Sequence, residues 1–165
     1  MSMIGNYLRL PEAELQRVLQ APASITKLLY PEDDSELPPD RHLDTDKSWH
    51  LTHFLLTGEA WGGAEPFVNA VLGGTEIGTE DVGYGPARYL TPAQVGAVAS
   101  ALEGLSPNEL WERFDRQQVQ EAEIYPSGWE GNDTERDYIL EYFSDLKDHF
   151  ADAARDRDAM VLYIN

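Results

Sequence analysis

The stretch of sequence that decides the fold is residues 45–58, which read TDKSWHLTHFLLTG. On a helix, at about 100° per residue, its apolar side chains spread over most of the circumference. Asp46, His50, His53 and Thr57 fall together in one narrow sector. A helix that is apolar nearly all round lies inside a protein, where polar groups must find partners or bind something. This polar sector is therefore a candidate site.

The segments around this helix predict further strands and helices. Apolar runs predict strands at 3–10, 87–90 and 160–164. Helical spacing and start signals predict helices at 11–21, 24–30, 91–105, 106–114, 117–124 and 134–155, with Thr91, Ser106 and either Asp133 or Thr134 as N-caps. Residues 66–72 fit either a short helix or a strand. Residues 31–40 predict an acidic, proline-rich loop, and the five glycines of residues 73–85 predict a second loop.

Length and composition indicate one folded domain. The chain has 165 residues, of which 42% are apolar, and it includes four Trp, eight Tyr and five Phe. The absence of cysteine fits a cytoplasmic location. We see no signal peptide in the first residues and no apolar run long enough to cross a membrane.

The charge balance bears on the class of partner. Thirty acidic residues against 12 Lys and Arg give a formal net charge of -18. Repulsion from phosphates argues against nucleic acid and against anionic membrane surfaces. A basic protein partner fits this charge, and a merely well-solvated surface fits it too.

His50 and His53 are three residues apart, so they are neighbours on one helix face. Such a pair could bind a divalent metal with Asp44 or Asp46, but no second close pair of His or Cys exists to complete a structural site. We therefore predict neither a metal nor a cofactor. Core histidines bonded to backbone or to Tyr and Asp side chains, or a polar pocket for a small molecule, remain as interpretations.

The second loop supplies further candidate ligand-binding residues. Arg88, between Tyr84 and Tyr89, could hold a carboxylate or phosphate, or could pair with a carboxylate of its own chain. Tyr125 could line a pocket or pack in the core. The candidate ligand-binding set is Asp46, His50, His53, Tyr84, Arg88 and Tyr125. No serine stands in a Gly-x-Ser-x-Gly elbow, and the sequence leaves open whether the protein is an enzyme.

Several motifs resemble the YfbM-like family, bacterial proteins grouped as a domain of unknown function. They are Met-Ile-Gly at 3–5, the Asp-Lys-x-Trp-His-x-x-His-Phe-Leu-Leu-Thr-Gly core at 46–58, Ala-Val-Leu-Gly-Gly at 70–74, Gly-Tyr-Gly-Pro-Ala-Arg-Tyr-Leu-Thr at 83–91 and Ile-Tyr-Pro at 124–126. The resemblance covers almost the whole chain. It implies a single α/β domain over residues 1–165, a layered sandwich with a small mixed sheet flanked by helices. It implies no reaction, ligand or catalytic residue.

Two functional hypotheses follow. The first is a cytoplasmic, acidic, protein-binding module, with an immunity-type role as an analogy. The alternative is a small-molecule-binding protein or enzyme with a pocket around His50, His53, Tyr84 and Arg88. Convergence of those side chains on one concave pocket would favour the alternative. Buried, internally bonded histidines would favour the first hypothesis.

Overall fold

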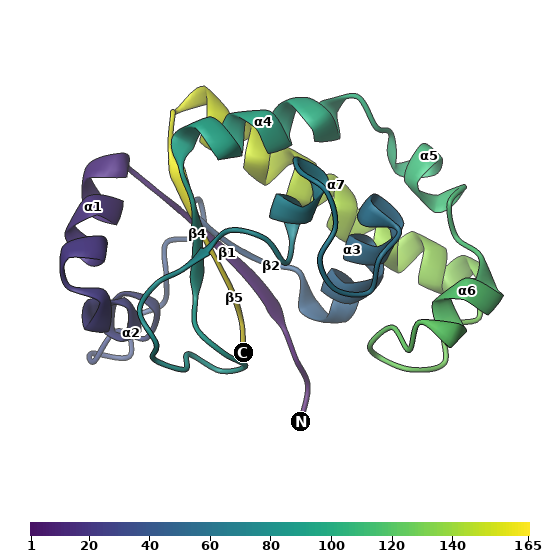
Figure 1. The fold of residues 1–165 in the computed structure, drawn as a ribbon, viewed down its shortest axis with the longest axis horizontal. Helices are drawn as coiled ribbons and strands as arrows, with labels where there is room; N and C mark the ends of the chain where they lie inside the picture. Colours follow the sequence, from purple (N-terminus) through teal and green to yellow (C-terminus); the bar gives the residue numbers. More distant parts are fainter.

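A computed structural model describes residues Met1–Asn165 and places a five-stranded sheet between two groups of helices (Figure 1). The strand order is β2-β1-β5-β4-β3. The strands are β1 (Gly5–Leu10), β2 (His42–Asp44), β3 (Thr75–Glu76), β4 (Arg88–Leu90) and β5 (Ala159–Ile164). The layered α/β class is confirmed.

The sheet itself differs from the expected mixed sheet, because every strand pair is antiparallel. The connection between β4 and β5 shows the physical reason. The chain leaves the sheet at Leu90, runs out along α4 (Pro92–Glu103) and returns along α7 (Asp133–Arg155), which packs against α4. It re-enters the sheet beside the point where it left, since Leu90 pairs with Met160. A helical excursion that returns to the same end of a sheet produces antiparallel neighbours.

The pleat of the central strands sends alternate side chains to two separate cores. Tyr7 and Leu162 point toward a cluster of 23 buried residues, whereas Leu8 and Val161 point toward a cluster of 12. The larger cluster is built with α3 (Trp49–Thr57), α4, α5 (Pro107–Trp111), α6 (Arg116–Glu121) and α7. The smaller cluster is built with α1 (Glu12–Gln20) and α2 (Ile25–Leu29). The helices therefore cover both faces of the sheet.

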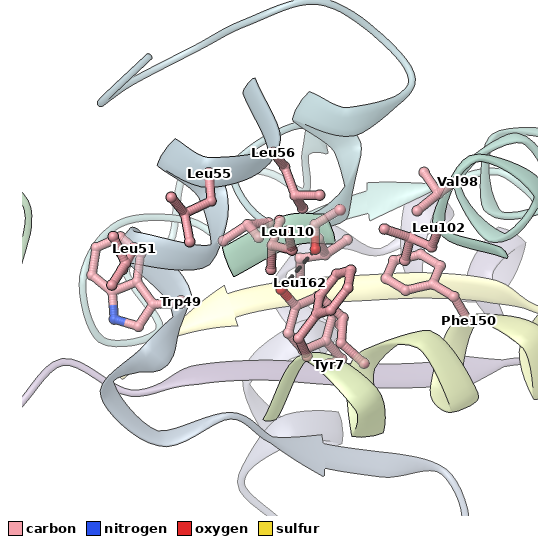
Figure 2. Close-up of a cluster of buried hydrophobic side chains, with 14 of the residues drawn as sticks. Tyr7, Trp49, Leu51, Leu55, Leu56, Val98, Leu102, Leu110, Phe150 and Leu162 are labelled. Carbon is pink, nitrogen blue, oxygen red and sulfur yellow. Dashed lines mark hydrogen bonds between the residues drawn. The ribbon is translucent and has the colours of Figure 1, made fainter. Parts of the chain in front are cut away.

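The central helix α3 is buried nearly all round, as its sequence predicts. All its residues except Phe54 and Thr57 are buried, and Trp49, Leu51, Leu55 and Leu56 project into the larger cluster (Figure 2). Gly58 ends the helix with a left-handed backbone, at φ 78°. A short 3₁₀ turn, Asp46–Ser48, precedes the helix.

Most other expected elements are present, with several differences at their ends. Thr91 and Ser106 cap α4 and α5 as expected, each through a reciprocal capping box. The cap of α7 is Asn132, so the expectation of Asp133 or Thr134 as the cap is wrong by one or two residues. Residues 66–72, which fit either a short helix or a strand by sequence, contain a 3₁₀ helix, Phe67–Ala70. No helix combines the length and apolar composition that crossing a bilayer requires.

Gly5 lies where β1 passes closest to the start of α3. A Cβ atom on Gly5 would lie 2.7 Å from Thr45 Oγ1 and 2.8 Å from Trp49 Cβ. We expect Gly5→Ala to lower the free energy of unfolding by about 2 kcal/mol, because the added methyl group overpacks this contact. Urea unfolding followed by circular dichroism measures the change.

The matched control is Gly96→Ala within α4, where a Cβ atom meets nothing within 4 Å. That substitution should leave stability unchanged or raise it by about 0.5–1 kcal/mol, since alanine favours a helix over glycine. Equal losses in the two variants would contradict the steric explanation.

Candidate functional site

His50 has partners for both of its ring nitrogens. Its Nε2–H donates to Ala60 O at 2.9 Å, and the backbone N–H of Tyr125 donates to its Nδ1 at 2.8 Å. The ring therefore carries its hydrogen on Nε2 and is neutral. It packs against Trp49 and Trp61 at centroid distances of 4.9 and 4.5 Å. Burial lowers the pKa of His50, which keeps the ring neutral at pH 7.

His53 is fully buried and has one partner. Its Nε2–H donates to Gly62 O at 2.8 Å, while its Nδ1 is buried without a hydrogen-bond partner. Burial lowers the pKa of His53 to about 4. The two histidines thus bind the carbonyl groups of residues 60 and 62 and hold that irregular segment against α3. Nowhere in the structure do three or more His, Asp or Glu side chains gather as ligands of a metal would.

Arg88, on β4, likewise holds an irregular segment in place by donating to its backbone carbonyls. Its guanidinium donates to Val71 O at 3.0 Å and to Gly73 O at 2.7 Å, and it forms no ion pair with a carboxylate. Tyr7 reaches the same segment, since its hydroxyl donates to Ala70 O at 2.7 Å. Burial lowers the pKa of Arg88. The charge of Arg88 also helps to lower the pKa of His53, so these two side chains lie in one electrostatic environment.

The remaining candidates lie in different places. Tyr125 belongs with His50: its ring stacks on Trp49 at 5.7 Å, and its hydroxyl accepts from Met3 N–H at 2.9 Å. Tyr84 is 45% exposed, and only its backbone N–H is engaged, with Ile164 O at 2.9 Å. Asp46 turns away toward α7. The structure thus joins Tyr125 to His50, which neighbours His53 on α3, whereas Arg88 acts on His53 only through its charge. Tyr84 and Asp46 do not contact these residues through any side-chain hydrogen bond.

Asp46 instead belongs to a group of carboxylates that we call the acidic patch. The group consists of Asp44, Asp46, Glu141 and Asp145, whose charges all act on Tyr142. Burial first, and then the charges of these four residues, raise the pKa of Tyr142. Tyr138 donates to Asp46 Oδ2 at 2.8 Å and packs edge-on against Tyr142 at 5.1 Å.

None of the four carboxylates of the acidic patch forms an ion pair with a basic side chain. The ion pairs of α7 lie at its two ends, through Arg136 and Arg155, and none reaches the four carboxylates. The spacing of four residues from Asp137 through Glu141 to Asp145 could have signalled this surface, because it repeats along one helix face. Asp44 and Asp46 join it only through the fold.

A cavity of about 680 Å³ is also lined by Asp44. Asp44 and His42 of β2, Asn6 of β1 and Tyr163 of β5 form one wall, and α2 with the loop 31–39 forms the other. Asn6 pairs directly with Asp44 and with Tyr163, so the three side chains share one face of the sheet. The sequence interpretation missed this cavity. The polar Asn6 within an apolar strand is the signal that could have indicated it.

The family of this chain follows from comparison with known proteins. The family model DUF1877, a domain of unknown function, matches residues 1–163. Protein YfbM of Escherichia coli (strain K12) is 34% identical over 129 residues, which cover 76% of this chain and 74% of that protein. The crystal structure of YfbM, a protein of unknown function from Escherichia coli, superposes with a TM-score of 0.74 at 26% identity, covering 98% of this chain and 99% of that one. The chain therefore belongs to the DUF1877 family, as its YfbM-like motifs indicated.

Proposed function

We propose that this protein is a binding module for a basic protein partner, which docks on the acidic patch. The observation that carries the proposal is a set of four carboxylates whose charges act on Tyr142 and which form no ion pair, one of them, Asp46, being held in place by Tyr138. Like charges held together weaken the isolated fold, whereas a cationic partner would relieve their repulsion. Tyrosine is also among the side chains that anchor protein interfaces.

The overall charge of the molecule supports the same proposal. A net charge of -18 accelerates encounters with a cationic surface and makes the association sensitive to salt. An immunity-type role, in which the module blocks a basic toxin, is the narrower form of the proposal and rests on analogy. We propose the cytoplasm as the compartment, which the cysteine-free sequence supports.

The alternative proposal, a small-molecule or catalytic pocket at His50, His53, Tyr84 and Arg88, has less support. A general base needs a free ring nitrogen facing a substrate. Both nitrogens of His50 are engaged, and His53 is fully buried. Nη1 of Arg88 donates to two backbone carbonyls and so holds the guanidinium against residues 71–73.

Reversing two charges of the acidic patch tests the docking proposal. We expect Glu141→Lys with Asp145→Lys to weaken binding of a fluorescein-labelled lysine-rich decapeptide at least about tenfold, or 1.4 kcal/mol. The peptide stands in for the basic partner, and fluorescence anisotropy at 50 mM and 150 mM salt measures its affinity.

The control is the double variant Glu103→Lys with Glu112→Lys, which makes the same change in net charge at exposed positions outside the patch. Its affinity should fall by less than about threefold, because screening weakens the effect of distant surface charges. A similar loss in both double variants would reduce the binding to net charge alone and would refute the patch as the docking surface.

A further inference from the structure

The cavity beside Asp44 has a hydrogen-bond network that fixes the roles of its atoms. Asn6 Nδ2 donates to Ile4 O at 3.1 Å and to Asn165 Oδ1 at 2.8 Å. The other amide atom of Asn6, Oδ1, is therefore the one that faces His42 Nε2 at 2.9 Å. An oxygen acceptor there requires a hydrogen on Nε2 of His42. Burial lowers the pKa of His42, so its ring is neutral at pH 7 and this hydrogen is its only one.

This assignment leaves the hydroxyl hydrogen of Tyr163 without an acceptor. Tyr163 Oη lies 3.4 Å from His42 Nε2, which already donates its only hydrogen to Asn6. A hydroxyl cannot donate to a nitrogen that carries a hydrogen, and no other side-chain hydrogen bond reaches this hydroxyl. Tyr163 is nevertheless only 3% exposed and lines the cavity. A buried hydroxyl of this kind needs an acceptor that the protein itself does not supply.

Asp44 lies near this hydroxyl and has the opposite need. It shares the face of the sheet with Tyr163, because Asn6 of β1 pairs with both residues. Asp44 Oδ1 accepts from the backbone N–H of Asp46 at 2.7 Å, whereas no donor reaches Oδ2. Burial first, and then Tyr30 and the charge of Asp44, raise the pKa of Tyr163, yet Tyr163 and Asp44 form no hydrogen bond. A group between them must accept from Tyr163 and donate to Asp44, and a hydroxyl group does both.

Tyr30 adds a rigid aromatic ring to the cavity. Its hydroxyl donates to Val82 O and accepts from Asn165 Nδ2 at 3.2 Å, so both ends of the side chain are fixed. Tyr30 is 40% exposed, and its ring meets Tyr163 edge-on at 6.4 Å. A fixed and partly exposed ring beside a cavity offers a flat apolar surface to the C–H groups of a ligand.

The rest of the lining selects a ligand that is neutral and has several hydroxyl groups. Asp34, Ser35 and Glu36 contribute further oxygen acceptors, and no Lys or Arg lines the cavity. The carboxylates repel an anion. An ammonium group, which only donates, would leave the hydrogen of Tyr163 unpaired, and an apolar molecule would satisfy neither Tyr163 nor Asp44. The volume of about 680 Å³ is within the range of cavities that bind small organic molecules.

We propose that this cavity binds a neutral monosaccharide, one hydroxyl group of which bridges Tyr163 and Asp44. That hydroxyl accepts the hydrogen of Tyr163 Oη and donates its own hydrogen to Asp44 Oδ2. The C–H face of the sugar ring lies against Tyr30. Two sources share this chemistry: a free sugar, and a sugar residue within a glycan. The inference does not rest on the proposed docking function, although Asp44 belongs to both the cavity and the acidic patch.

Titration with D-glucose, D-galactose and D-mannose, followed by two-dimensional ¹H–¹⁵N NMR, tests the proposal. Galactose and mannose each differ from glucose in the orientation of one hydroxyl group, so the set presents neighbouring hydroxyls in different arrangements. We expect at least one of the three to produce saturable shifts at the amides of Asn6, His42 and Tyr163, with a dissociation constant below about 10 mM.

Two further probes test the chemistry of recognition. Tetrahydropyran has the same ring without hydroxyl groups and should produce no such shifts. The uronate of the sugar that binds most tightly adds one carboxylate and should bind at least about tenfold more weakly than that sugar. Binding of either probe as tight as that of the sugar would overturn the proposal. An absence of saturable shifts with all three sugars would overturn it as well, because the cavity would then hold only solvent.

Two conservative variants identify the atoms of the bridge. Tyr163→Phe removes only the hydroxyl and should weaken binding of the sugar about fivefold. Asp44→Asn should weaken it about tenfold, because a hydrogen bond to a charged acceptor is the stronger one. Circular dichroism verifies that each variant is folded. Unchanged affinity in both variants would refute the assignment.

Each of these variants has a matched control outside the cavity. Tyr84→Phe removes a hydroxyl from a tyrosine that is 45% exposed and does not line the cavity. Glu112→Gln makes the same change in net charge as Asp44→Asn at an exposed position. Both controls should leave sugar binding unchanged. Losses equal to those of the cavity variants would contradict a bridge at Tyr163 and Asp44.

The methyl α- and β-glycosides of the sugar that binds distinguish the two sources. Binding of either glycoside as tight as that of the free sugar indicates a residue within a glycan, and loss of binding in both indicates a free sugar. Salt separates this proposal from the docking proposal, because binding of a neutral sugar should not depend on ionic strength, whereas peptide docking should. Glu141 and Asp145 do not line the cavity, so their double variant should bind the sugar normally.

Discussion

Replacing His50 with alanine is expected to lower the free energy of unfolding by about 4 kcal/mol. The substitution leaves the Ala60 carbonyl and the Tyr125 N–H without their present partners. It also opens a void against Trp49, which is itself buried in the larger core. The loss of two buried hydrogen bonds and the unfilled volume act together, since both result from removal of one ring.

Chemical denaturation at pH 7.5 measures this loss. Trp61→Ala is the matched control, because Trp61 contacts the same His50 ring at 4.5 Å but is 65% exposed. We expect it to change stability by less than about 1 kcal/mol. If His50→Ala is as mild as the control, the histidine does not fasten these segments, and a role for its ring in ligand binding regains support.

The second large effect is a loss of stability in mild acid. His53 and His149 each keep one ring nitrogen buried without a partner. Burial lowers the pKa of both to about 4, with the positive charge of Arg88 acting on His53 and that of Arg9 on His149. In the unfolded chain each histidine titrates near 6.5. The unfolded state therefore binds more protons between these values, and stability falls as the pH drops from 6.5 toward 4.

The expected slope is about 1.4 kcal/mol per pH unit for each histidine within that window. Urea unfolding at pH 7.5, 6.0, 5.0 and 4.5 measures it. In the variant His53→Gln, the free energy of unfolding should fall less steeply with pH, by the contribution of one histidine. This holds whatever the difference in stability between the variant and the original protein at pH 7.5. NMR titration of the His53 ring gives an independent check. A ring that titrates near pH 6.5 in the folded protein would contradict the prediction.

The sequence predicts the elements whose signals are local. The burial of α3 follows from its own apolar pattern, and Gly58 ends it because glycine tolerates the left-handed backbone that a helix end requires. Thr91 and Ser106 begin helices because each precedes proline and stands three residues before Gln or Glu. These signals need no knowledge of the rest of the fold.

The site could be predicted only in part, because its contacts join distant or irregular segments. The partners of His50 and His53 are carbonyls of residues 60 and 62, which no periodicity marks. Asp46 was grouped with them on the assumption of one regular helix. It lies instead in a 3₁₀ turn with φ 48°, so its side chain leaves that sector and meets Tyr138. The edge strands β2 and β3 were missed because two or three residues carry too little pattern.

The two central strands of the sheet, β1 and β5, cannot pair until the ribosome has made the residues between them. β1 and β5 pair along their whole lengths, yet they come from opposite ends of the chain. A ribosome makes β1 first and must complete nearly everything else before β5 emerges from the exit tunnel. Until then β1 and the apolar faces of α3 and α7 lack the strand that joins them. The nascent chain therefore reaches its native topology only once β5 has emerged, and until then its many negative charges disfavour association with neighbouring chains.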